Sequence, residues 1–487
     1  MRAFVVAFLF ALLWVTHLGA SHADGSQSEA LQNRITSGLE PALYIVGEPR
    51  RSTTLVSRMK YYRVPAVSIA VIDDYRVAWA YASGLSDVRQ KNPATTRTLF
   101  QAASMSKPVA AAAILRLFEE KRLNLDADVN TMLRSWHVPP SRFTATEHVT
   151  MRRLLSHSAG VNVHGFIGYD RDAALPTPVQ VLNGTPPANS GAVRVVAIPG
   201  SVTEYSGGGT TIAQQLAADV TGQPFATFMQ RTLLDPLHMT SSTFEQPLPK
   251  SWWPLAAAGY DADSRPVHGG WYVYPTMAAA GLWTTPSDLA QFVIAIQKAL
   301  RGNGIPPIDA AVAHEMTTEA SQGFGLGPQL LPGYFTHNGG NVGFRGIFIG
   351  LTRGGKGVVV MTNSDNGLQL ADEIVHSIAK AYRWPVLQPQ PRRAIPLSRP
   401  RMRQLVGTYT ANVGGESVTL DVTIDGRAAT PALFLRSPNS NFPERLYALA
   451  PLQLVTLSGT TFEISPTAND ERVPWLKFGQ TRFDRQP

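Results

Sequence analysis

A long apolar segment, preceded by two strand-like runs, constrains the fold of this chain most strongly. Across residues 104–122 apolar side chains recur at near-helical spacing, which predicts a long helix that is mostly buried. The runs before it, residues 67–72 and 76–81, alternate and are separated by residues 73–75, as is typical of an antiparallel hairpin. We therefore expect a sheet that begins with this hairpin and a helix that is buried in the core.

Further helices and strands follow along the chain. Helical patterns occur at residues 150–156, 211–221, 225–234, 286–300 and 372–382, and strands at residues 346–351 and 357–362 are expected to complete the sheet. Residues 160–199 are rich in Gly, Pro and Asn and have weak periodicity. We predict a long loop there, lying over the candidate site described below.

The composition of the chain changes after the helix predicted at residues 372–382. Residues 384–399 are rich in Pro and Arg, which is typical of a linker. Beyond them, short β-like runs such as residues 417–424 and 446–456 are punctuated by Gly, Pro and Asn, which predicts a small antiparallel barrel or sandwich. We therefore predict one unit over residues 24–395 and a second, without a catalytic site of its own, over residues 400–487.

The N-terminus has the organisation of a secretory signal. Arg2 precedes an unbroken apolar run over residues 3–15, and the small residues around Ala23 form a cleavage site. The run is shorter than the ~20 apolar residues that a membrane-spanning helix needs, so a cleaved signal is favoured over a membrane anchor. We expect cleavage near Ala23 and a soluble protein that is exported to a bacterial periplasm or secreted, with no stable membrane span.

The cysteine count and the charge exclude several function classes. The chain has no cysteine, which excludes a thiol nucleophile, a cysteine-ligated metal, disulfides and a lipid on cysteine. Loss of Arg2 with the signal changes the formal net charge from +8 to +7, which favours anionic surfaces such as cell-wall polymers. Because no basic patch concentrates this charge, we expect no nucleic-acid binding.

One pattern in the sequence carries the chemistry of a nucleophile and its base. Ser104 and Lys107 are three residues apart, which in a helix brings hydroxyl and amine to one face within hydrogen-bond reach. The same S-x-x-K spacing recurs from Ser57 and from Ser377, so the pattern alone is weak. Ser104 is favoured because it opens the long apolar helix. The alternative is a helix-capping serine beside a solvated lysine.

Two glycine-rich stretches supply further candidate groups. Tyr205 precedes three consecutive glycines, and its phenol can relay a proton between nucleophile and leaving group. The alternative is a packing tyrosine before a flexible turn. His337, Asn338, Gly339 and Gly340 are typical of a surface turn beside a strand, yet the glycines allow close approach of the backbone to a substrate, and its N–H groups can bind an oxyanion.

In this order the three stretches resemble the serine β-lactamase, D,D-peptidase and esterase superfamily, especially the branch related to class C β-lactamases. The resemblance covers about residues 60–390 and includes residues 154–160, 234–240 and 280–288. It implies an α+β fold in which helices flank an antiparallel sheet, with an all-helical subdomain and a small C-terminal antiparallel β domain. No cofactor and no metal are implied.

The resemblance also implies a role for each candidate residue. Ser104 is the acylated nucleophile, Lys107 is its base, and Tyr205 is the proton relay. His337 stands where many relatives have lysine. The implied oxyanion hole is formed by the backbone N–H groups of Ser104 and Gly340, whereas His157 is expected to be structural.

One departure from the family pattern concerns the substrate. Gly207 replaces an asparagine that binds the substrate's amide in many relatives, and a glycine cannot make that contact. Gly207, Gly339 and Gly340 are our candidates for substrate binding. With His337 in place of lysine, Gly207 argues against an efficient β-lactamase and leaves esterase, D-aminopeptidase and D,D-peptidase activity open.

We therefore expect a serine hydrolase that acts on a small ester or a substrate containing a D-amino acid, with cell-wall material as a further candidate partner. A β-lactamase and a non-catalytic peptidoglycan-binding protein on the same fold are the alternatives. Lys107 must be neutral to act as a base, and we expect burial and a nearby cationic His337 to lower its pKa.

Overall fold

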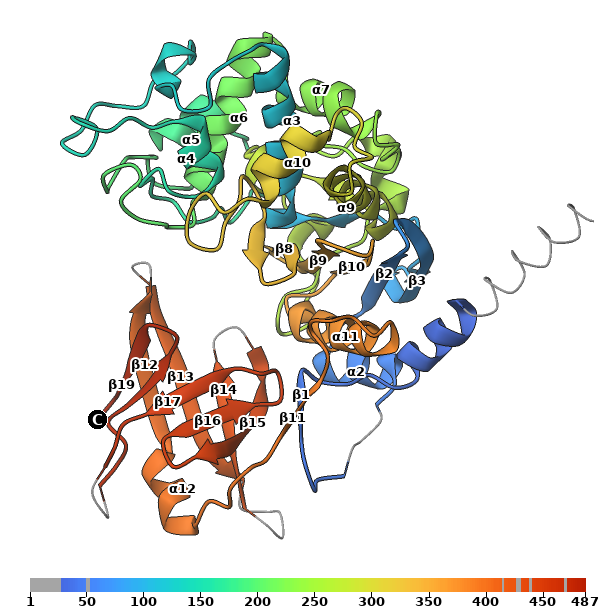
Figure 1. The fold of residues 1–487 in the computed structure, drawn as a ribbon, viewed down its shortest axis with the longest axis vertical. Coiled ribbons are helices and arrows are strands. Elements are labelled where there is room, and N and C mark those ends of the chain that lie inside the picture. Colours follow the sequence, from blue (N-terminus) through green and yellow to red (C-terminus); the bar gives the residue numbers. More distant parts are fainter. Residues whose placement is uncertain (1–27, 50–52, 414–415, 426–430, 438–439, 468–470) are drawn as a thin grey trace, which may run out of the picture.

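A seven-stranded antiparallel sheet forms the centre of the computed structural model (Figure 1), which describes residues 28–49, 53–413, 416–425, 431–437, 440–467 and 471–487. The strand order is β4-β3-β2-β10-β9-β8-β7. These strands are β2 (Ala66–Asp73), β3 (Arg76–Asp87), β4 (Asn92–Pro93), β7 (Gln329–Leu331), β8 (Tyr334–Asn341), β9 (Phe344–Leu351) and β10 (Gly357–Thr362). The predicted hairpin is β2 and β3, and β10 pairs with β2, with Val71 opposite Val358.

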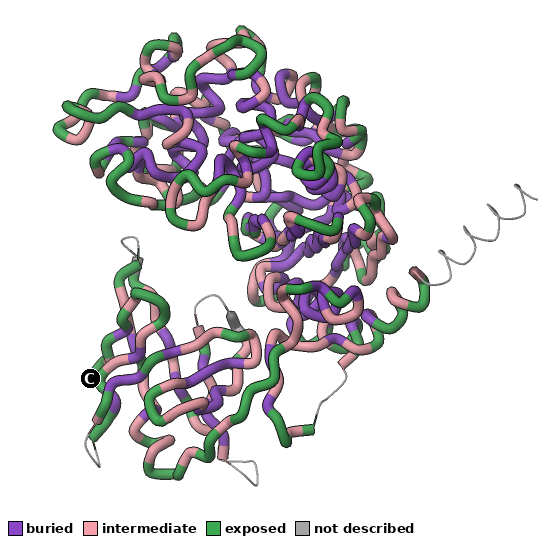
Figure 2. The backbone as a smooth tube through the Cα atoms, viewed as in Figure 1, coloured by how far each residue is buried: buried purple, intermediate pink, exposed green. Residues whose placement is uncertain are grey.

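Both faces of this sheet are covered by helices. In β2, Val67 and Ile69 pack on one side with helices α2 (Leu55–Tyr62) and α11 (Gly367–Ala381). Ala66 and Ala70 pack on the other side with helices α3 (Ser106–Glu120) and α9 (Pro286–Leu300). Because neither face of the central strands meets water, they are apolar almost throughout. Figure 2 shows the buried backbone concentrated in these layers.

The helices beyond α3 and α9 form the predicted helical region. They are α4 (Met151–Leu155), α5 (Pro178–Asn183), α6 (Gly207–Thr221), α7 (Phe225–Met229), α8 (Met277–Ala280) and α10 (Ala310–Thr317). Helix α3 contacts α6, α8 and α10. Its run of alanines at residues 110–113 is fully buried, and these short side chains let neighbouring backbones come close. In the described part of the chain, no helix is long and apolar enough to cross a membrane.

A closed barrel of eight antiparallel strands follows the larger part. Its strands are β12 (Gly407–Val413), β13 (Glu416–Asp425), β14 (Ala432–Ser437), β15 (Ser440–Ala450), β16 (Gln453–Thr456), β17 (Thr461–Ile464), β18 (Trp475–Phe478) and β19 (Thr481–Arg485), preceded by helix α12 (Arg399–Leu405). Alternate side chains such as Leu420, Val422 and Phe483 fill its interior. The predicted α+β fold with a small C-terminal antiparallel domain is confirmed, and that domain is a barrel.

The barrel is joined to the larger part near the N-terminal segment. Strand β1 (Leu43–Ile45) pairs in parallel with β11 (Gln390–Arg392), and Figure 1 shows both between the barrel and helices α2 and α11. Phe442 of the barrel packs against Tyr61 and Tyr62 of α2, with ring centroids 5.3 and 5.4 Å apart.

Some details differ from the sequence expectations. Residues 337–340 lie within strand β8, so the surface-turn alternative is wrong. Helix α6 begins at Gly207, four residues earlier than predicted, because the Ser206 hydroxyl accepts from the Gly209 N–H and caps the helix. The predicted single run over residues 446–456 is split between β15 and β16. The predicted signal peptide, residues 1–23, lies outside the described residues.

Candidate active site

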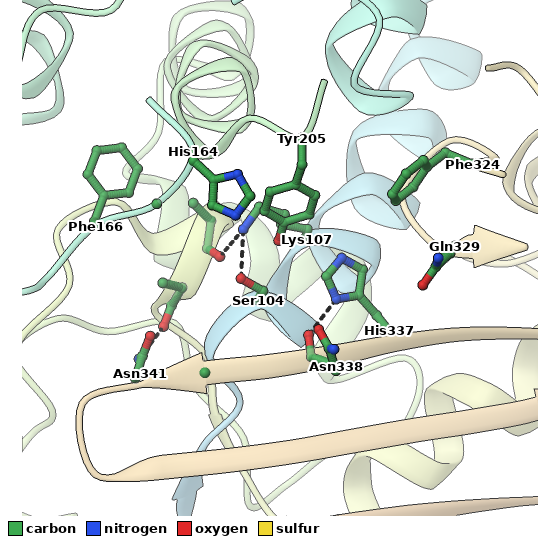
Figure 3. Close-up of a pocket in the computed structure, with 14 residues that line it drawn as sticks. Ser104, Lys107, His164, Phe166, Tyr205, Phe324, Gln329, His337, Asn338 and Asn341 are labelled. Carbon is green, nitrogen blue, oxygen red and sulfur yellow. Dashed lines mark hydrogen bonds between the residues drawn. The ribbon is translucent and has the colours of Figure 1, made fainter. Parts of the chain in front are cut away.

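A cavity of about 390 Å³ lies where the start of α3, the segment before α6, helix α8, strand β8 and the predicted long loop meet (Figure 3). Its lining residues are Ser104, Lys107, His164, Gly165, Phe166, Tyr205, Ala279, Ala280, Phe324, Gln329, His337, Asn338, Gly340 and Asn341. Segments more than 200 residues apart in the sequence therefore supply one site. All four predicted catalytic residues, Ser104, Lys107, Tyr205 and His337, are among them.

Ser104 is held at a sharp turn between a buried strand and a buried helix. Strand β5 (Phe100–Gln101) pairs with β6 (Trp283–Thr284), and a 3₁₀ turn over Ala103–Met105 leads into α3. Ala103 has φ of 50°, a left-handed conformation that costs a non-glycine residue about 1–3 kcal/mol. Its neighbours are buried, whereas Ser104 is partly exposed. The turn thus presents the hydroxyl to the cavity.

Lys107 has the contacts expected of a base for Ser104. Its Nζ donates to Ser104 Oγ at 3.0 Å and to the carbonyl oxygen of Ala279 at 2.8 Å. The side chain is only 4% exposed, and burial lowers the pKa of Lys107 to about 7 because a buried ammonium ion loses its hydration. At neutral pH a large fraction of Lys107 is therefore a free amine.

The other two S-x-x-K matches form no such pair. Ser57 is exposed and donates to the Thr54 carbonyl at 2.8 Å, which is a helix-start contact. Ser377 donates to the Glu373 carbonyl at 2.6 Å, and Lys380 binds Glu40 instead of this serine. Of the three S-x-x-K matches, only Ser104 and Lys107 form a serine–lysine pair in the part of the chain that the structure describes.

Tyr205 lies directly beside this pair. The Lys107 Nζ is 4.8 Å from the centroid of the Tyr205 ring, and the rings of His157 and His164 flank it at 4.5 and 4.8 Å. Burial raises the pKa of Tyr205, and a hydrogen bond between the Tyr205 and Ser104 side chains only partly opposes this rise. The phenol is therefore protonated at neutral pH and can donate.

His337 also lines the cavity, and Figure 3 shows its ring beneath that of Tyr205. Its Nδ1 donates to the Asn338 carbonyl oxygen at 2.5 Å. Burial, with the nearby Lys107, lowers the pKa of His337 to about 4, so the imidazole is neutral. The expectation that a cationic His337 lowers the Lys107 pKa is therefore wrong, and burial alone accounts for it.

The three predicted substrate-binding glycines are placed differently. Gly340 lines the cavity. Gly339 does not, and a Cβ on it would come within 2.1 Å of the Ala102 carbonyl oxygen, so it allows β8 to pass close to the turn that carries Ser104. Gly207 also lies outside the lining, and its N–H donates to the His164 carbonyl at 3.0 Å. For Gly207 and Gly339, substrate binding remains a prediction.

His157 has the contacts of a structural residue. It is 3% exposed, and its Nδ1 accepts from the Ser206 N–H at 3.2 Å. This bond holds the segment that leads from Tyr205 into α6. His157 does not line the cavity.

Several lining residues carried no signal in the sequence. His164 and Phe166 belong to the predicted loop over the site, but weak periodicity gave no reason to single them out. Phe324 and Gln329 precede β8 and enter the site only because the chain folds back there. Among the described residues, no group of three or more His, Asp or Glu side chains is placed to hold a metal ion.

The sequence of this chain matches a known protein family and several curated proteins. A family model described as Beta-lactamase matches residues 52–383. Protein flp of Staphylococcus aureus (strain N315) is 29% identical over 228 residues, which are 46% of this chain and 42% of that protein. The match thus spans less than half the length of this relative.

Two solved structures share the fold at low sequence identity. The octameric penicillin-binding protein homologue from Pyrococcus abyssi is 22% identical with a TM-score of 0.55, covering 88% of this chain and 98% of that one. The D-amino acid amidase from Ochrobactrum anthropi SV3 is 20% identical with a TM-score of 0.56, covering 73% of this chain and 98% of that one.

Proposed function

Because the chain belongs to the beta-lactamase family, we propose that it is a serine hydrolase that cleaves esters or small amides through an acyl intermediate on Ser104. The observation that carries this proposal is the 3.0 Å hydrogen bond between Lys107 Nζ and Ser104 Oγ, made by a lysine whose pKa burial lowers to about 7, so that a large fraction of it is neutral at neutral pH. A solvated lysine would be protonated and unable to accept the serine proton. A nucleophile paired with a base in this way is the requirement for covalent catalysis.

Acylation follows from these positions. Lys107 accepts the proton of Ser104 as Oγ attacks the carbonyl carbon of the substrate, and the negative charge develops on the carbonyl oxygen. The backbone N–H groups of Ser104 and Gly340 are the donors proposed for this oxyanion. The oxyanion then collapses and the bond to the leaving group breaks. Tyr205, protonated because burial raises its pKa, donates a proton to that leaving group and is reprotonated by Lys107.

Deacylation repeats these steps with water as the nucleophile. The neutral Lys107 accepts a proton from the water as it attacks the acyl carbon, while Tyr205 keeps its own proton. The second oxyanion collapses, the bond between the acyl carbon and Ser104 Oγ breaks, Lys107 returns the proton to Oγ, and the free acid leaves. Each turnover therefore consumes one water and restores the starting protonation states.

The proposed substrate class rests on Gly207 and His337, the two residues at which this site differs from many relatives. Gly207 has no side chain to bind an amide, and the loop segment with His164 packs against it. His337 is neutral. Both features favour simple esters and small amides over β-lactams, and the shared fold with a D-amino acid amidase supports small D-amino-acid amides as a second choice. Export also remains a proposal, and an intact mass beginning at Asp24 would support it.

The test compares a short-chain nitrophenyl ester, a chromogenic cephalosporin and a D-Ala-D-Ala peptide at equal concentrations of the purified protein. We expect the ester to have the highest kcat/KM and Ser104→Ala to abolish its hydrolysis. Faster turnover of the cephalosporin would overturn the substrate assignment. Hydrolysis at the wild-type rate by Ser104→Ala would overturn the mechanism.

A further inference from the structure

The cavity contains amide and imidazole groups but no permanently charged side chain. Asn338, Asn341 and Gln329 contribute uncharged polar groups, while the described lining residues include no Asp, Glu or Arg. Lys107 is the one lysine among them, and both of its described partners, Ser104 and the Ala279 carbonyl, are needed to hold it as a base. A substrate that brings a charge into this cavity thus finds no free counter-ion.

His337 presents an unprotonated ring nitrogen, and therefore a negative electrostatic potential, on its side of the cavity. The carbonyl oxygen of Asn338 can only accept a hydrogen bond, so the hydrogen of the neutral ring is on Nδ1. Nε2 therefore carries the lone pair, and no described group donates to it. The side chain is 4% exposed, so water does not screen this nitrogen well. An anion placed against the ring would be repelled.

Arg345 lies beside the cavity lining and already has partners. Arg345 lies opposite Gly340 on β9, and a Cβ on Gly340 would come within 3.4 Å of its guanidinium carbon. Its Nη1 donates to the carbonyl oxygens of Asn341 and Phe344 at 2.6 and 2.8 Å and lies 2.8 Å from Asp365 Oδ1. The ion pair with Asp365 therefore offsets the positive charge that Arg345 contributes at the rim.

A carboxylate in the cavity would also oppose the proposed chemistry. A negative charge within a few ångströms favours the protonated form of a nearby amine. Lys107 would then hold its proton and could not accept that of Ser104. Uncharged substrates leave the base in its active form.

We infer, on the basis of the proposed function, that the site is selective for substrates uncharged around the scissile bond, such as neutral esters and carboxamides, and discriminates against leaving groups with a free carboxylate. With this selectivity, the enzyme cleaves neutral esters and amides faster than peptides in which a free carboxylate lies next to the cleaved bond. The discrimination arises from His337 and from the pairing of Arg345 with Asp365.

The test uses thioesters of one acyl group with three leaving thiols: thioglycolamide, methyl thioglycolate and thioglycolate. Each is measured at pH 8 as a competitor that slows the labelling of Ser104 by a fluorophosphonate, and by thiol release. We expect the two neutral thioesters to reach half-inhibition at concentrations at least about tenfold lower than the carboxylate, a factor equivalent to about 1.4 kcal/mol. Equal or better competition by the carboxylate, or no competition by any of them, would overturn the inference.

Variants at His337 identify the source of the selectivity. His337→Lys adds a cation to the wall and should reduce the preference for neutral thioesters at least about tenfold, while the uncharged control His337→Gln should retain it. If both variants keep the wild-type preference, His337 is not its origin and that part of the inference fails. A wild-type protein that is not labelled at Ser104 would overturn the proposed function and this inference with it, whereas labelling without selectivity overturns this inference alone.

Discussion

Lys107 combines a functional role with a cost to folding. Among the described residues, its hydrogen-bond partners are a serine hydroxyl and one carbonyl, so burial favours the neutral amine and the pKa is about 7. An unfolded chain has this lysine near its ordinary pKa of 10.5. Between pH 7 and 10.5 the unfolded state thus binds more protons, and the contribution of Lys107 to folding stability becomes less unfavourable as pH rises through this window.

The same pKa predicts the pH dependence of activity. We expect kcat/KM for a neutral nitrophenyl ester to rise with pH, with an inflection near 7, and to level off above about pH 8, because only neutral Lys107 can accept the Ser104 proton. His337, with a pKa of about 4, is neutral throughout this range. A profile that is flat between pH 6 and 8 would contradict the assignment of the base.

Replacement of this lysine tests the link between function and stability. Lys107→Met should lower kcat/KM by at least about 10²-fold and raise the melting temperature at pH 7, since a methionine avoids the burial of an amine. The matched control is Lys60→Met, which changes the exposed lysine of another S-x-x-K match and should leave both quantities unchanged. Wild-type activity of Lys107→Met would show that Lys107 is not the base, and a lower melting temperature would show that its burial does not cost stability.

At the scale of elements, the site depends on how closely β8 passes the turn that carries Ser104. The backbone of β8 contacts this turn, and Gly339 faces the Ala102 carbonyl where a Cβ would be only 2.1 Å away. Gly340, the next residue, supplies the second proposed oxyanion donor. The position of that N–H group is therefore set by the packing of β8 on the turn.

This packing predicts a strong effect of one methyl group. Gly339→Ala should push β8 away from Ala102, displace the Gly340 N–H and reduce kcat by about 10²-fold, the loss typical of a missing oxyanion donor. Gly191→Ala is the control, because a Cβ at Gly191 meets nothing within 4 Å. Steady-state kinetics with one ester and melting curves for both variants check this expectation. Equal kcat values for the two variants would show that the close packing of β8 on the Ala102 turn is not needed for catalysis.

The sequence predicted elements well where local patterns are strong. Helix α9 has the predicted bounds, because a Thr285 cap and a proline start signal mark its beginning. Strand β8 was missed, since His337, Asn338 and the two glycines have low strand propensity and pair only because β9 lies beside them. The start of α6 was placed too late because glycines are poor helix formers.

At the scale of the whole molecule, the barrel contacts the larger part through the N-terminal segment and α2. Tyr447 of the barrel donates to Glu48 at 2.9 Å, and Phe442 packs against Tyr61 and Tyr62. None of these residues lines the cavity. The contacts therefore predict that the barrel supports stability more than the chemical step.

A change at Phe442 separates these two effects. Phe442→Ala should lower the free energy of unfolding by about 1–3 kcal/mol through loss of two aromatic contacts, with kcat/KM for a neutral ester unchanged. The control is Val413→Ala on the exposed side of the barrel, where the side chain is 43% exposed. Denaturant unfolding and ester kinetics of both proteins provide the comparison. A large loss of activity in Phe442→Ala would mean that the barrel acts on the site.

The site as a whole was predictable only in part. Ser104, Lys107, Tyr205 and His337 were named from short patterns, and the structure brings all four together. The neutral state of His337 was not foreseen, because it depends on burial and on the Lys107 charge beside it. Long-range packing also decides which serine meets a lysine, and no local pattern contains that information.

Whether Ser104 is the nucleophile can be tested by locating the covalent adduct after reaction with a fluorophosphonate, by mass spectrometry of the digested protein. We expect one adduct on the peptide that contains Ser104, no adduct in Ser104→Ala, and much slower labelling of Lys107→Met. An adduct on Ser57 or Ser377 in place of Ser104, or an unmodified Ser104 in a protein that hydrolyses the ester, would contradict the assignment of Ser104 as the nucleophile.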